Sequence, residues 1–533
     1  MKIFKQLVLI VLDGLGVASS SEGNPIIAAD PRNLNYLINH FPAITLQASG
    51  PSVGLPWGER GNSEVGHLNL GAGRIVRQDL PRISQAIGSG EFFKNPAFLA
   101  GLQHVKKNDS KLHLIGLLSP GGIHSAEEHL YALLALAAQQ GVPRVFVHIF
   151  TDGRDTPPKQ ALMSLDRLFR KFLETGVGKI ASLTGRFYAM DRGRHWEVTE
   201  QTYRALVLGE GKQAVAARSA IQDYYQQQIY DEVIPPTVIV ENGQPLARIE
   251  AGDAVFFFNF RPDRLVQLVE SLVSPEFDEF SQKYPRLSNL YCLTMTEYGK
   301  NLGTAVAFPP QEHKNCLTEV LSSHRLSQFH IAESEKSAHV TSFFNGSRQE
   351  PWPHEEREII SSPAAYQKGY QDVPEMSLDE IGRRIVEKLK AGTNFILANF
   401  ANPDMVGHTG NREASILAIR AVDRNLGLIF EEALPLDACV VITADHGNIE
   451  ELINIHSGMP ETEHSLNPVP LIIAGRGLER NVIGTKGYLE LPPLVPEGLL
   501  SDVSPTILEL MGVPKPPEMT AISLLPLLAS NNK

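Results

Sequence analysis

The feature that most constrains this chain is a pattern used three times, an apolar run of strand length that ends near an aspartate. Continuous runs rich in leucine, isoleucine and valine are typical of strands buried on both faces of a parallel sheet. Because ligands of open α/β sheets bind at the carboxyl ends of the strands, the three aspartates are expected to meet at one site. The runs are Leu7–Leu12, Phe395–Phe400 and Cys439–Thr443, and the aspartates are Asp13, Asp404 and Asp445.

The long stretch of chain between the first run and the other two indicates an insertion. Residues from about 80 to about 310 alternate between strand-like and helix-like segments and are numerous enough for an independent α/β domain. Residues 76–82 and 308–315, which contain proline and polar side chains, are the candidate hinges. The candidate strands are 111–118, 144–150, 179–183, 254–260 and 290–294, and the candidate helices include 127–140 and 159–174.

Length, charge and cysteine content narrow the class of protein. A chain of 533 residues exceeds the size of one hydrophobic core, so at least two domains are expected. Its 48 basic and 60 acidic residues give a net charge of −12, which disfavours binding to nucleic acid or an anionic membrane. Three scattered cysteines suit a reducing cytosol, and the six-residue run Leu7–Leu12 is too short for a signal or membrane helix. We therefore expect a cytoplasmic protein. Any anionic ligand would have to be bound by cations gathered at its binding site.

The residue types that follow the predicted strands are ligands of divalent ions. One aspartate and histidine stand four residues apart, a single helical turn, and another such pair is adjacent and followed by glycine. Six such groups exceed the needs of one tetrahedral ion and point to two ions about 3.5–4 Å apart. Taken singly, Asp13 could form a turn and His464 could be a surface histidine. The candidate ligands are Asp13, Asp404, His408, Asp445, His446 and His464.

Ser63 is the candidate nucleophile, in the run Gly61-Asn62-Ser63-Glu64-Val65-Gly66-His67. The spacing of the glycines differs from the serine elbow of hydrolases, and no P-loop lysine is present. A serine on a glycine-rich turn that enters a helix meets backbone N–H groups suited to phosphate, and metal coordination can activate its hydroxyl. The local alternative is that Ser63 simply caps the helix.

Taken together, these motifs resemble cofactor-independent phosphoglycerate mutase over nearly the whole chain, in the expected order. The resemblance implies an alkaline-phosphatase-like metal-binding domain, residues 1–77 and 311–533, with a substrate-binding α/β phosphotransferase domain inserted at 78–310. The shared motifs are Leu12-Asp13-Gly14, residues 61–67, Gly121-Gly122-Ile123-His124-Ser125, Asp152-Gly153-Arg154-Asp155-Thr156, Asn259-Phe260-Arg261-Pro262-Asp263-Arg264, residues 402–408 and residues 443–448.

The resemblance also implies the roles of individual residues and two divalent ions, with Mn²⁺ the usual ion of bacterial members. One ion is expected on Asp404, His408 and His464, and the other on Asp13, Ser63, Asp445 and His446. Lys336 is expected to reach the nucleophile and the phosphate. Two departures from the family pattern are residues 451–463 and Ser465-Leu466 after His464, where relatives typically have Thr-Thr, whereas Asn467-Pro468-Val469-Pro470 keeps the register. The expected phosphoglycerate ligands are His124, Arg154, Asp155, Arg186, Arg192, Arg261, Arg264 and Lys336.

These expectations define a hypothesis for function. Ser63 would take the phosphate of 3-phosphoglycerate as phosphoserine and return it as 2-phosphoglycerate, in glycolysis and gluconeogenesis, without 2,3-bisphosphoglycerate. Arginine suits the carboxylate and phosphate of such a substrate, and Asp155 could exchange a proton with its hydroxyl. Domain closure would exclude water, and the family suggests a monomer. The alternatives are a metal-dependent phosphatase or phosphopentomutase of the same superfamily, and a catalytically dead metal-binding or scaffold protein.

Overall fold

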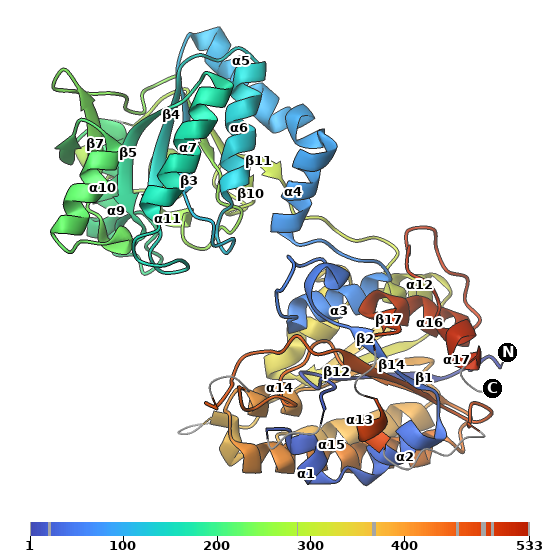
Figure 1. Cartoon of the computed structure of the whole chain (residues 1–533). Coiled ribbons are helices and arrows are strands. Elements are labelled where there is room, and N and C mark those ends of the chain that lie inside the picture. The colour runs from blue at the N-terminus through green and yellow to red at the C-terminus, as the bar shows by residue number, and fades with distance from the viewer. Residues whose placement is uncertain are drawn as a thin grey trace. The chain divides into compact units, whose positions relative to one another are not determined.

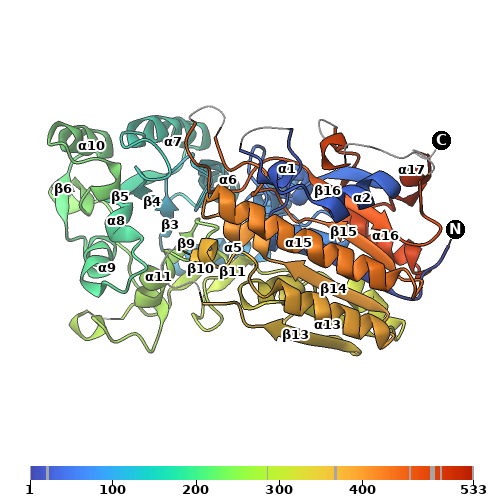
Figure 2. The same ribbon diagram turned by 90° about the horizontal axis from the view of Figure 1, so that it is seen from below.

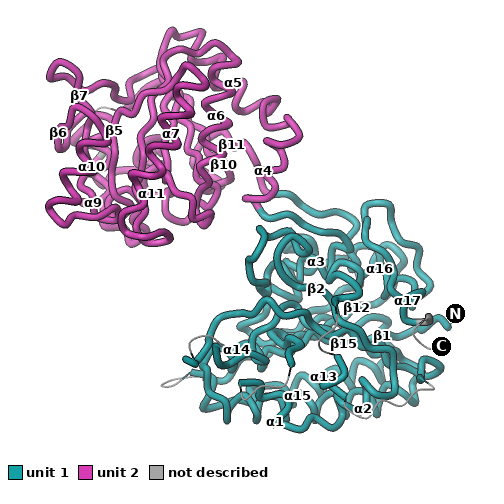
Figure 3. The backbone as a smooth tube through the Cα atoms, viewed as in Figure 1, with its two compact units in different colours: residues 1–78, 311–533 teal, residues 79–310 magenta. Residues whose placement is uncertain are grey.

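The computed structural model describes residues 2–19, 23–284, 286–364, 369–454, 458–480, 487–491 and 495–530. The chain forms two compact units (Figure 3). Unit 1 combines residues 1–78 with residues 311–533, and unit 2 consists of residues 79–310. Unit 1 is therefore built from both ends of the chain.

In the described part of unit 1, eight strands form one sheet in the order β13-β12-β14-β1-β15-β16-β2-β17. Five neighbours, from β13 to β15, run parallel, whereas β16 is antiparallel to both β15 and β2. The bounds are β1 Leu7–Leu12, β2 Ala43–Gln47, β12 Gln328–Glu333, β13 Glu355–Ile360, β14 Phe395–Phe400, β15 Cys439–Thr443, β16 Val469–Ala474 and β17 Gly498–Leu499.

Helices cover both faces of this sheet (Figures 1 and 2). The long helix α15 packs against α1, α2 and α13 on one face, whereas α3 packs against α12 and α16 on the other. Every residue of β1, β14 and β15 is consequently buried, which explains why these strands are almost entirely apolar. The bounds are α1 Pro25–Ala29, α2 Arg32–His40, α3 Ser63–Ala72, α12 Leu317–Ser323, α13 Leu378–Lys390, α14 Asn402–Gly407, α15 Arg412–Ala433, α16 Val503–Leu510 and α17 Leu525–Ser530.

Unit 2 has its own sheet, with the order β11-β10-β9-β3-β4-β5-β7-β6 among the described residues and β8 paired to β7. The five predicted strands of this region are present as β3, β4, β5, β9 and β10, with ends shifted by up to three residues. The bounds are β3 Leu112–Leu117, β4 Val145–Thr151, β5 Lys179–Gly185, β6 Lys212–Ala214, β7 Thr237–Glu241, β8 Gln244–Pro245, β9 Ala254–Phe257, β10 Tyr291–Thr296 and β11 Ala305–Phe308.

Two separate hydrophobic cores, one on each face, hold helices against the sheet of unit 2. Helices α5, α6, α7 and α10 contribute to one core, and α9 and α11 contribute to the other. No described helix of either unit combines the length and apolar character needed to cross a membrane. The bounds are α4 Asp79–Ser89, α5 Pro96–Asn108, α6 Glu127–Gln139, α7 Ala161–Thr175, α8 Arg186–Ala189, α9 Trp196–Tyr203, α10 Ala217–Gln226 and α11 Val266–Val273.

Candidate active site

Three neighbouring strands of unit 1 bring their aspartates to one place. Strands β14, β1 and β15 are parallel, and Leu12 at the end of β1 lies level with Phe400 at the end of β14. Asp13 follows β1 directly, Asp445 follows β15, and Asp404 lies on α14, the helix after β14. All three aspartates are buried. The predicted convergence of the three strand ends is therefore confirmed.

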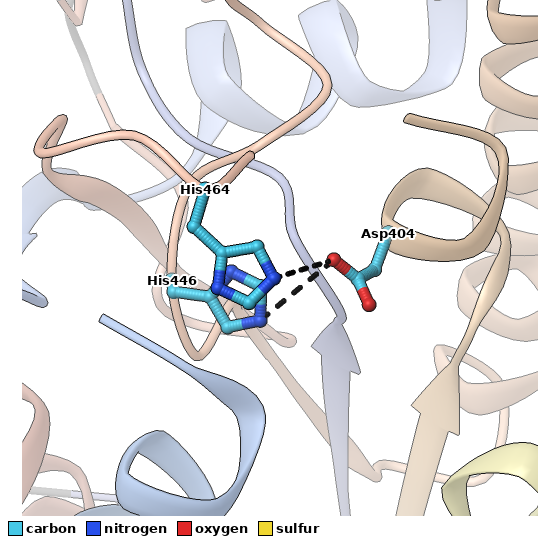
Figure 4. Close-up of side chains that lie close together, drawn as sticks. All are labelled: Asp404, His446 and His464. Carbon is cyan, nitrogen blue, oxygen red and sulfur yellow. Dashed lines mark ion pairs between the residues drawn. The ribbon is translucent and has the colours of Figure 1, made fainter. Parts of the chain in front are cut away.

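Three histidines direct their Nε2 atoms at one oxygen, Oδ1 of Asp404. The distances are 3.2 Å for His408, 3.3 Å for His464 and 3.9 Å for His446. Figure 4 shows the imidazoles of His446 and His464 stacked, with ring centroids 3.9 Å apart, beside the Asp404 carboxylate. The helical-turn relationship predicted for Asp404 and His408 is also present, because the His408 N–H donates to the Asp404 carbonyl at 3.0 Å.

Each of these imidazoles holds its other ring nitrogen against a backbone carbonyl. A carbonyl oxygen can only accept a hydrogen bond, so Nδ1 carries a proton and Nε2 is the nitrogen that a metal ion can take. Such contacts orient histidines in metal sites. The carbonyls belong to Thr462, 2.7 Å from His408, to Gly61, 2.8 Å from His464, and to Gly447, 3.2 Å from His446.

Ser63 is the first residue of α3, and its side chain does not cap that helix. The capping residue is Asn62, whose side-chain oxygen accepts a hydrogen bond from the Val65 N–H at 3.0 Å. The local alternative for Ser63 is therefore wrong, because its neighbour does the capping. The Ser63 hydroxyl instead donates to Asp13 Oδ1 at 3.1 Å and lies 2.9 Å from His446 Nε2.

Lys336, at the end of a short 3₁₀ turn (Ser334–Lys336) after β12, completes this cluster. Its ammonium group donates to Asp13 and Asp404 at 2.6 Å and to the Ser63 hydroxyl at 2.9 Å. Burial lowers the pKa of Lys336, but the charges of Asp13, Asp404 and Asp445 outweigh it and raise this pKa above the ordinary value. The lysine therefore stays charged beside the candidate nucleophile.

The buried acids carry more negative charge than Lys336 can balance, and the donor atoms fit divalent cations. Two groups of three residues have ligand atoms within 4.8 Å of one another. Burial lowers the pKa of His446, but Asp445, Asp13 and Asp404 outweigh it and raise this pKa to about 9. A bound metal ion would replace that proton. The groups are Asp404, His446 and His464, and Asp13, His67 and Asp445.

The sequence analysis missed two residues that hold the aspartates. His67, on α3, is fully buried with Nδ1 3.2 Å from Asp445 Oδ2. Asn399, the one polar residue within β14, donates to Asp13 Oδ2 at 2.7 Å and lies 3.1 Å from His67 Nε2. Asn399 could have been found from the sequence, because a polar side chain inside a buried apolar strand needs a polar partner. For His67, membership of the shared motif was the only signal.

In unit 2 the predicted substrate ligands form a second cluster, organised by three aspartates. Asp263 contacts Arg261 at 3.1 Å, Arg192 at 3.3 Å and His124 at 3.6 Å. Asp155 contacts Arg186 at 2.5 Å and His124 Nε2 at 3.8 Å. The third aspartate, which the sequence analysis did not assign, is Asp152, which accepts from Arg186 at 2.6 Å and from Ser119 at 2.5 Å.

A pocket of about 340 Å³ adjoins this cluster, and its charged lining residues are Arg154, Arg186 and Arg264 together with Asp191, Glu197 and Glu232. Burial, together with Arg186 and Arg192, lowers the pKa of Arg264, as expected where cations gather without enough anions. Burial, and secondly Arg186, lower the pKa of His124 to about 4, so this imidazole is neutral at pH 7. Arg154, Arg186, Arg192, Arg261 and Arg264 thus outnumber the three aspartates of the cluster, and their guanidinium groups are suited to bind an anion.

Known proteins resemble this chain over its full length. A family model described as the BPG-independent PGAM N-terminus matches residues 83–300. A 2,3-bisphosphoglycerate-independent phosphoglycerate mutase of Clostridium acetobutylicum is 46% identical over 522 residues, covering 98% of this chain and 99% of the relative. A second such mutase, from Methanosarcina acetivorans, is 45% identical over 525 residues, covering 98% of this chain and 97% of the relative. A crystal structure of Leishmania mexicana phosphoglycerate mutase at low cobalt concentration has a TM-score of 0.62, 30% identity and 98% coverage of both chains.

The discontinuous α/β unit, the second α/β unit inserted in it and the carboxylate–histidine cluster at the strand ends are features of the alkaline-phosphatase-like class of fold. This class of fold is the one that the sequence motifs predicted. Within it, the chain belongs to the 2,3-bisphosphoglycerate-independent phosphoglycerate mutase family, whose members are isomerases.

Proposed function

We propose that the protein interconverts 3-phosphoglycerate and 2-phosphoglycerate through a phosphoserine on Ser63, in glycolysis and gluconeogenesis, without 2,3-bisphosphoglycerate. The observation that supports this most directly is the setting of the Ser63 hydroxyl, in contact with Lys336, Asp13 and His446. Serine needs activation to act as a nucleophile, and these contacts place it in a buried, charged cluster. The names of the relatives agree with this substrate class.

We propose that this cluster holds two divalent ions, taken to be Mn²⁺. Bound there, the ions would lower the pKa of the serine hydroxyl and offset negative charge on the phosphoryl group. The donor set of carboxylates and correctly oriented imidazoles supports this proposal. The proposed ligands, as the family resemblance implies them, are Asp404, His408 and His464 for one ion, and Asp13, Ser63, Asp445 and His446 for the other. By distance alone His446 groups with Asp404 and His464, and His67 groups with Asp13 and Asp445.

The proposed reaction conserves the phosphoryl group and protons. The Ser63 oxygen forms its bond to phosphorus as the bond between phosphorus and the C3 oxygen of the substrate breaks. The proton lost by Ser63 is matched by one gained by the released hydroxyl of glycerate, and we assign to Asp155 the proton exchange at that substrate hydroxyl. The C2 hydroxyl then takes the phosphoryl group, and Ser63 regains a proton. Lys336 donates to the serine oxygen and would stabilise charge on the group in transfer.

Glycerate must stay bound while the phosphoryl group is on the enzyme. Arginine binds carboxylate and phosphate with two parallel hydrogen bonds, and the arginine cluster of unit 2 supports this holding role. Water must be kept from the phosphoserine, since hydrolysis would turn the mutase into a phosphatase. The proposed holding residues are His124, Arg154, Asp155, Arg186, Arg192, Arg261 and Arg264.

A coupled assay of 2-phosphoglycerate formation, without 2,3-bisphosphoglycerate, tests the proposal. We expect 2-phosphoglycerate to form and free phosphate to stay at background. Release of phosphate without 2-phosphoglycerate would instead support a phosphatase, and a requirement for 2,3-bisphosphoglycerate would refute the proposed reaction. The monomeric state and the cytoplasmic location remain predictions from the sequence.

A further inference from the structure

A buried glutamate outside the two groups of candidate ligands joins the loops that carry them. Glu450 is 1% exposed, and four groups donate hydrogen bonds to its carboxylate. The backbone N–H groups of Gly16 and Asn448 donate to Oε2, both at 2.9 Å. The side chains of Ser465 and Asn467 donate to Oε1, the latter at 3.0 Å. Both oxygens of the carboxylate are thus fully used within the protein.

These four donors come from three different loops of the candidate metal centre. Gly16 lies three residues after Asp13, Asn448 two residues after His446, and Ser465 directly after His464. The loops follow β1, follow β15 and precede β16, respectively. One carboxylate therefore links the backbone positions of three candidate ligands that are distant in sequence.

The side chain of Glu450 is tightly packed against two glycines. A Cβ atom at Gly16 would lie 2.4 Å from the Glu450 Cδ, and one at Gly447 would lie 2.4 Å from its Oε1. Such distances are below any van der Waals contact, so both glycines leave the room that the carboxylate fills. A short backbone bridge between Gly447 and Ser465 joins two of the loops beside it.

The charge of Glu450 is balanced by these hydrogen bonds. Within the described part of the chain no lysine, arginine or histidine forms an ion pair with it. Carboxylates that accept several such bonds are among the stronger hydrogen-bond acceptors in proteins. An anchor of this kind holds loops without adding a ligand or a cation to the centre.

We propose that Glu450 is a positioning residue that sets the geometry of Asp13, His446 and His464 for metal binding. It acts through the loop backbones and through Ser465 and Asn467, and it does not touch the metal ions. The inference rests on the proposed metal sites. It also gives a function to Ser465, which follows His464 where the sequence departs from the family pattern, and to the nearby Asn467.

The variant Glu450→Gln tests this role because it keeps the size of the side chain. Its amide nitrogen would face the Asn467 side-chain donor and could only donate to the Ser465 hydroxyl, so the link to the His464 loop weakens while the acceptor for the backbone N–H groups can remain. We expect the metal-free protein, titrated with Mn²⁺ in a calorimeter, to bind about 10- to 100-fold more weakly than wild type. The rise in melting temperature on adding Mn²⁺ should shrink in parallel.

The matched control is Glu355→Gln. Glu355 is a fully buried glutamate of the same unit that accepts hydrogen bonds from Asn345, Trp352 and Arg357, away from the ligand loops. Glu355→Gln should lower the melting temperature of the metal-free protein and leave its Mn²⁺ affinity unchanged. Equal Mn²⁺ affinities of Glu450→Gln and wild type would overturn the positioning role.

A second variant, Ser465→Ala, removes one donor and keeps the Glu450 carboxylate. We expect a smaller loss of Mn²⁺ affinity in the same direction, which tests the role even if Glu450→Gln folds poorly. Unchanged affinity in Ser465→Ala would remove the His464 loop from the proposal. If wild-type protein itself bound no divalent ion, the metal sites of the proposed function would fail, which differs from failure of the Glu450 role.

Discussion

The Nζ of Lys336 lies 2.9 Å from the Oγ of Ser63, although 273 residues separate them in the chain. The same ammonium group is held by Asp13 and Asp404 at 2.6 Å, so its position is set by the acids of the candidate metal centre. This relationship allows the two residues to be tested separately. Loss of the hydroxyl removes the atom that would carry the phosphoryl group, whereas loss of the ammonium group removes a charge and three hydrogen bonds but no reacting atom.

Ser63→Ala should reduce mutase turnover by roughly 10⁴-fold or more, since removal of a nucleophile leaves only binding and electrostatic effects. The coupled assay measures this loss, and mass spectrometry of acid-quenched wild-type enzyme should show a phosphorylated peptide that the variant lacks. Ser322→Ala is the control, because Ser322 is a buried serine of unit 1 that donates to the Pro353 carbonyl. Substantial turnover by Ser63→Ala would exclude the phosphoserine route.

The sequence could predict the three strand ends because the signal for a buried parallel strand is local and continuous. The proximity of Asp404 and His408 could be predicted as well, since a spacing of four residues corresponds to one turn of a helix. The arrangement around Asp404 depends instead on loop carbonyls such as that of Thr462, and loop conformation leaves no periodic signal. Part of that loop, residues 455–457 of the atypical segment 451–463, lies outside the described residues.

Residues that act through other side chains were the ones the sequence could not assign. His67 and Asn399 hold Asp445 and Asp13, and Asp152 and Asp263 organise the arginine cluster. Each is a polar residue whose partner lies on another element, so its role appears only once the elements are packed.

Lys336→Met should lower turnover by about 10²- to 10³-fold, as expected for loss of one group that stabilises transferring charge. The same change removes a cation from among Asp13, Asp404 and Asp445, so the affinity for Mn²⁺ should stay equal or rise. Turnover in the coupled assay and Mn²⁺ titration of the metal-free protein measure the two effects. Lys388→Met, which breaks a surface ion pair with Glu356, is the control. A parallel fall in metal affinity would mean that Lys336 supports the metal centre instead.

Removal of metal should abolish turnover and lower the melting temperature. Three buried aspartates face one lysine, and their repulsion increases when bound cations are removed. A ligand at 100 times its Kd contributes about 2.7 kcal/mol to the free energy of unfolding, a change visible in differential scanning fluorimetry. Dialysis against EDTA followed by addition of Mn²⁺, Mg²⁺, Co²⁺ or Zn²⁺ identifies the working ion. Full activity after thorough chelation would refute the two-ion proposal.

Because of the buried carboxyl of Glu333, the free energy of unfolding should fall as the pH rises from 5 to 7. Burial raises the pKa of this carboxyl from 4.5 to about 7, against the opposing hydrogen bonds from Ser377 and Ser362. Between these values the folded state keeps a proton that the unfolded state has lost, so the free energy of unfolding falls with pH, by up to about 3 kcal/mol. Glu333→Gln should flatten this part of the profile, measured by urea unfolding at each pH. Glu356→Gln, on the neighbouring strand β13, should leave it unchanged.

Arg264→Lys should weaken substrate binding more than it slows turnover. The Nε of Arg264 is buried and has no hydrogen-bond partner among the described residues, and the side chain lines the pocket shared with Arg154 and Arg186. A hydrogen bond to a charged group contributes about 1.5–3 kcal/mol, so loss of the guanidinium fork should raise KM about 10- to 100-fold. Steady-state kinetics with 3-phosphoglycerate measure this change, and calorimetric titration of the protein with the same ligand gives an independent affinity. Arg248→Lys is the matched control, since Arg248 pairs with Glu250 away from the pocket. Equal KM values for Arg264→Lys and wild type would show that the unpaired Nε is not a substrate contact, and the holding role would then pass to Arg154 and Arg186.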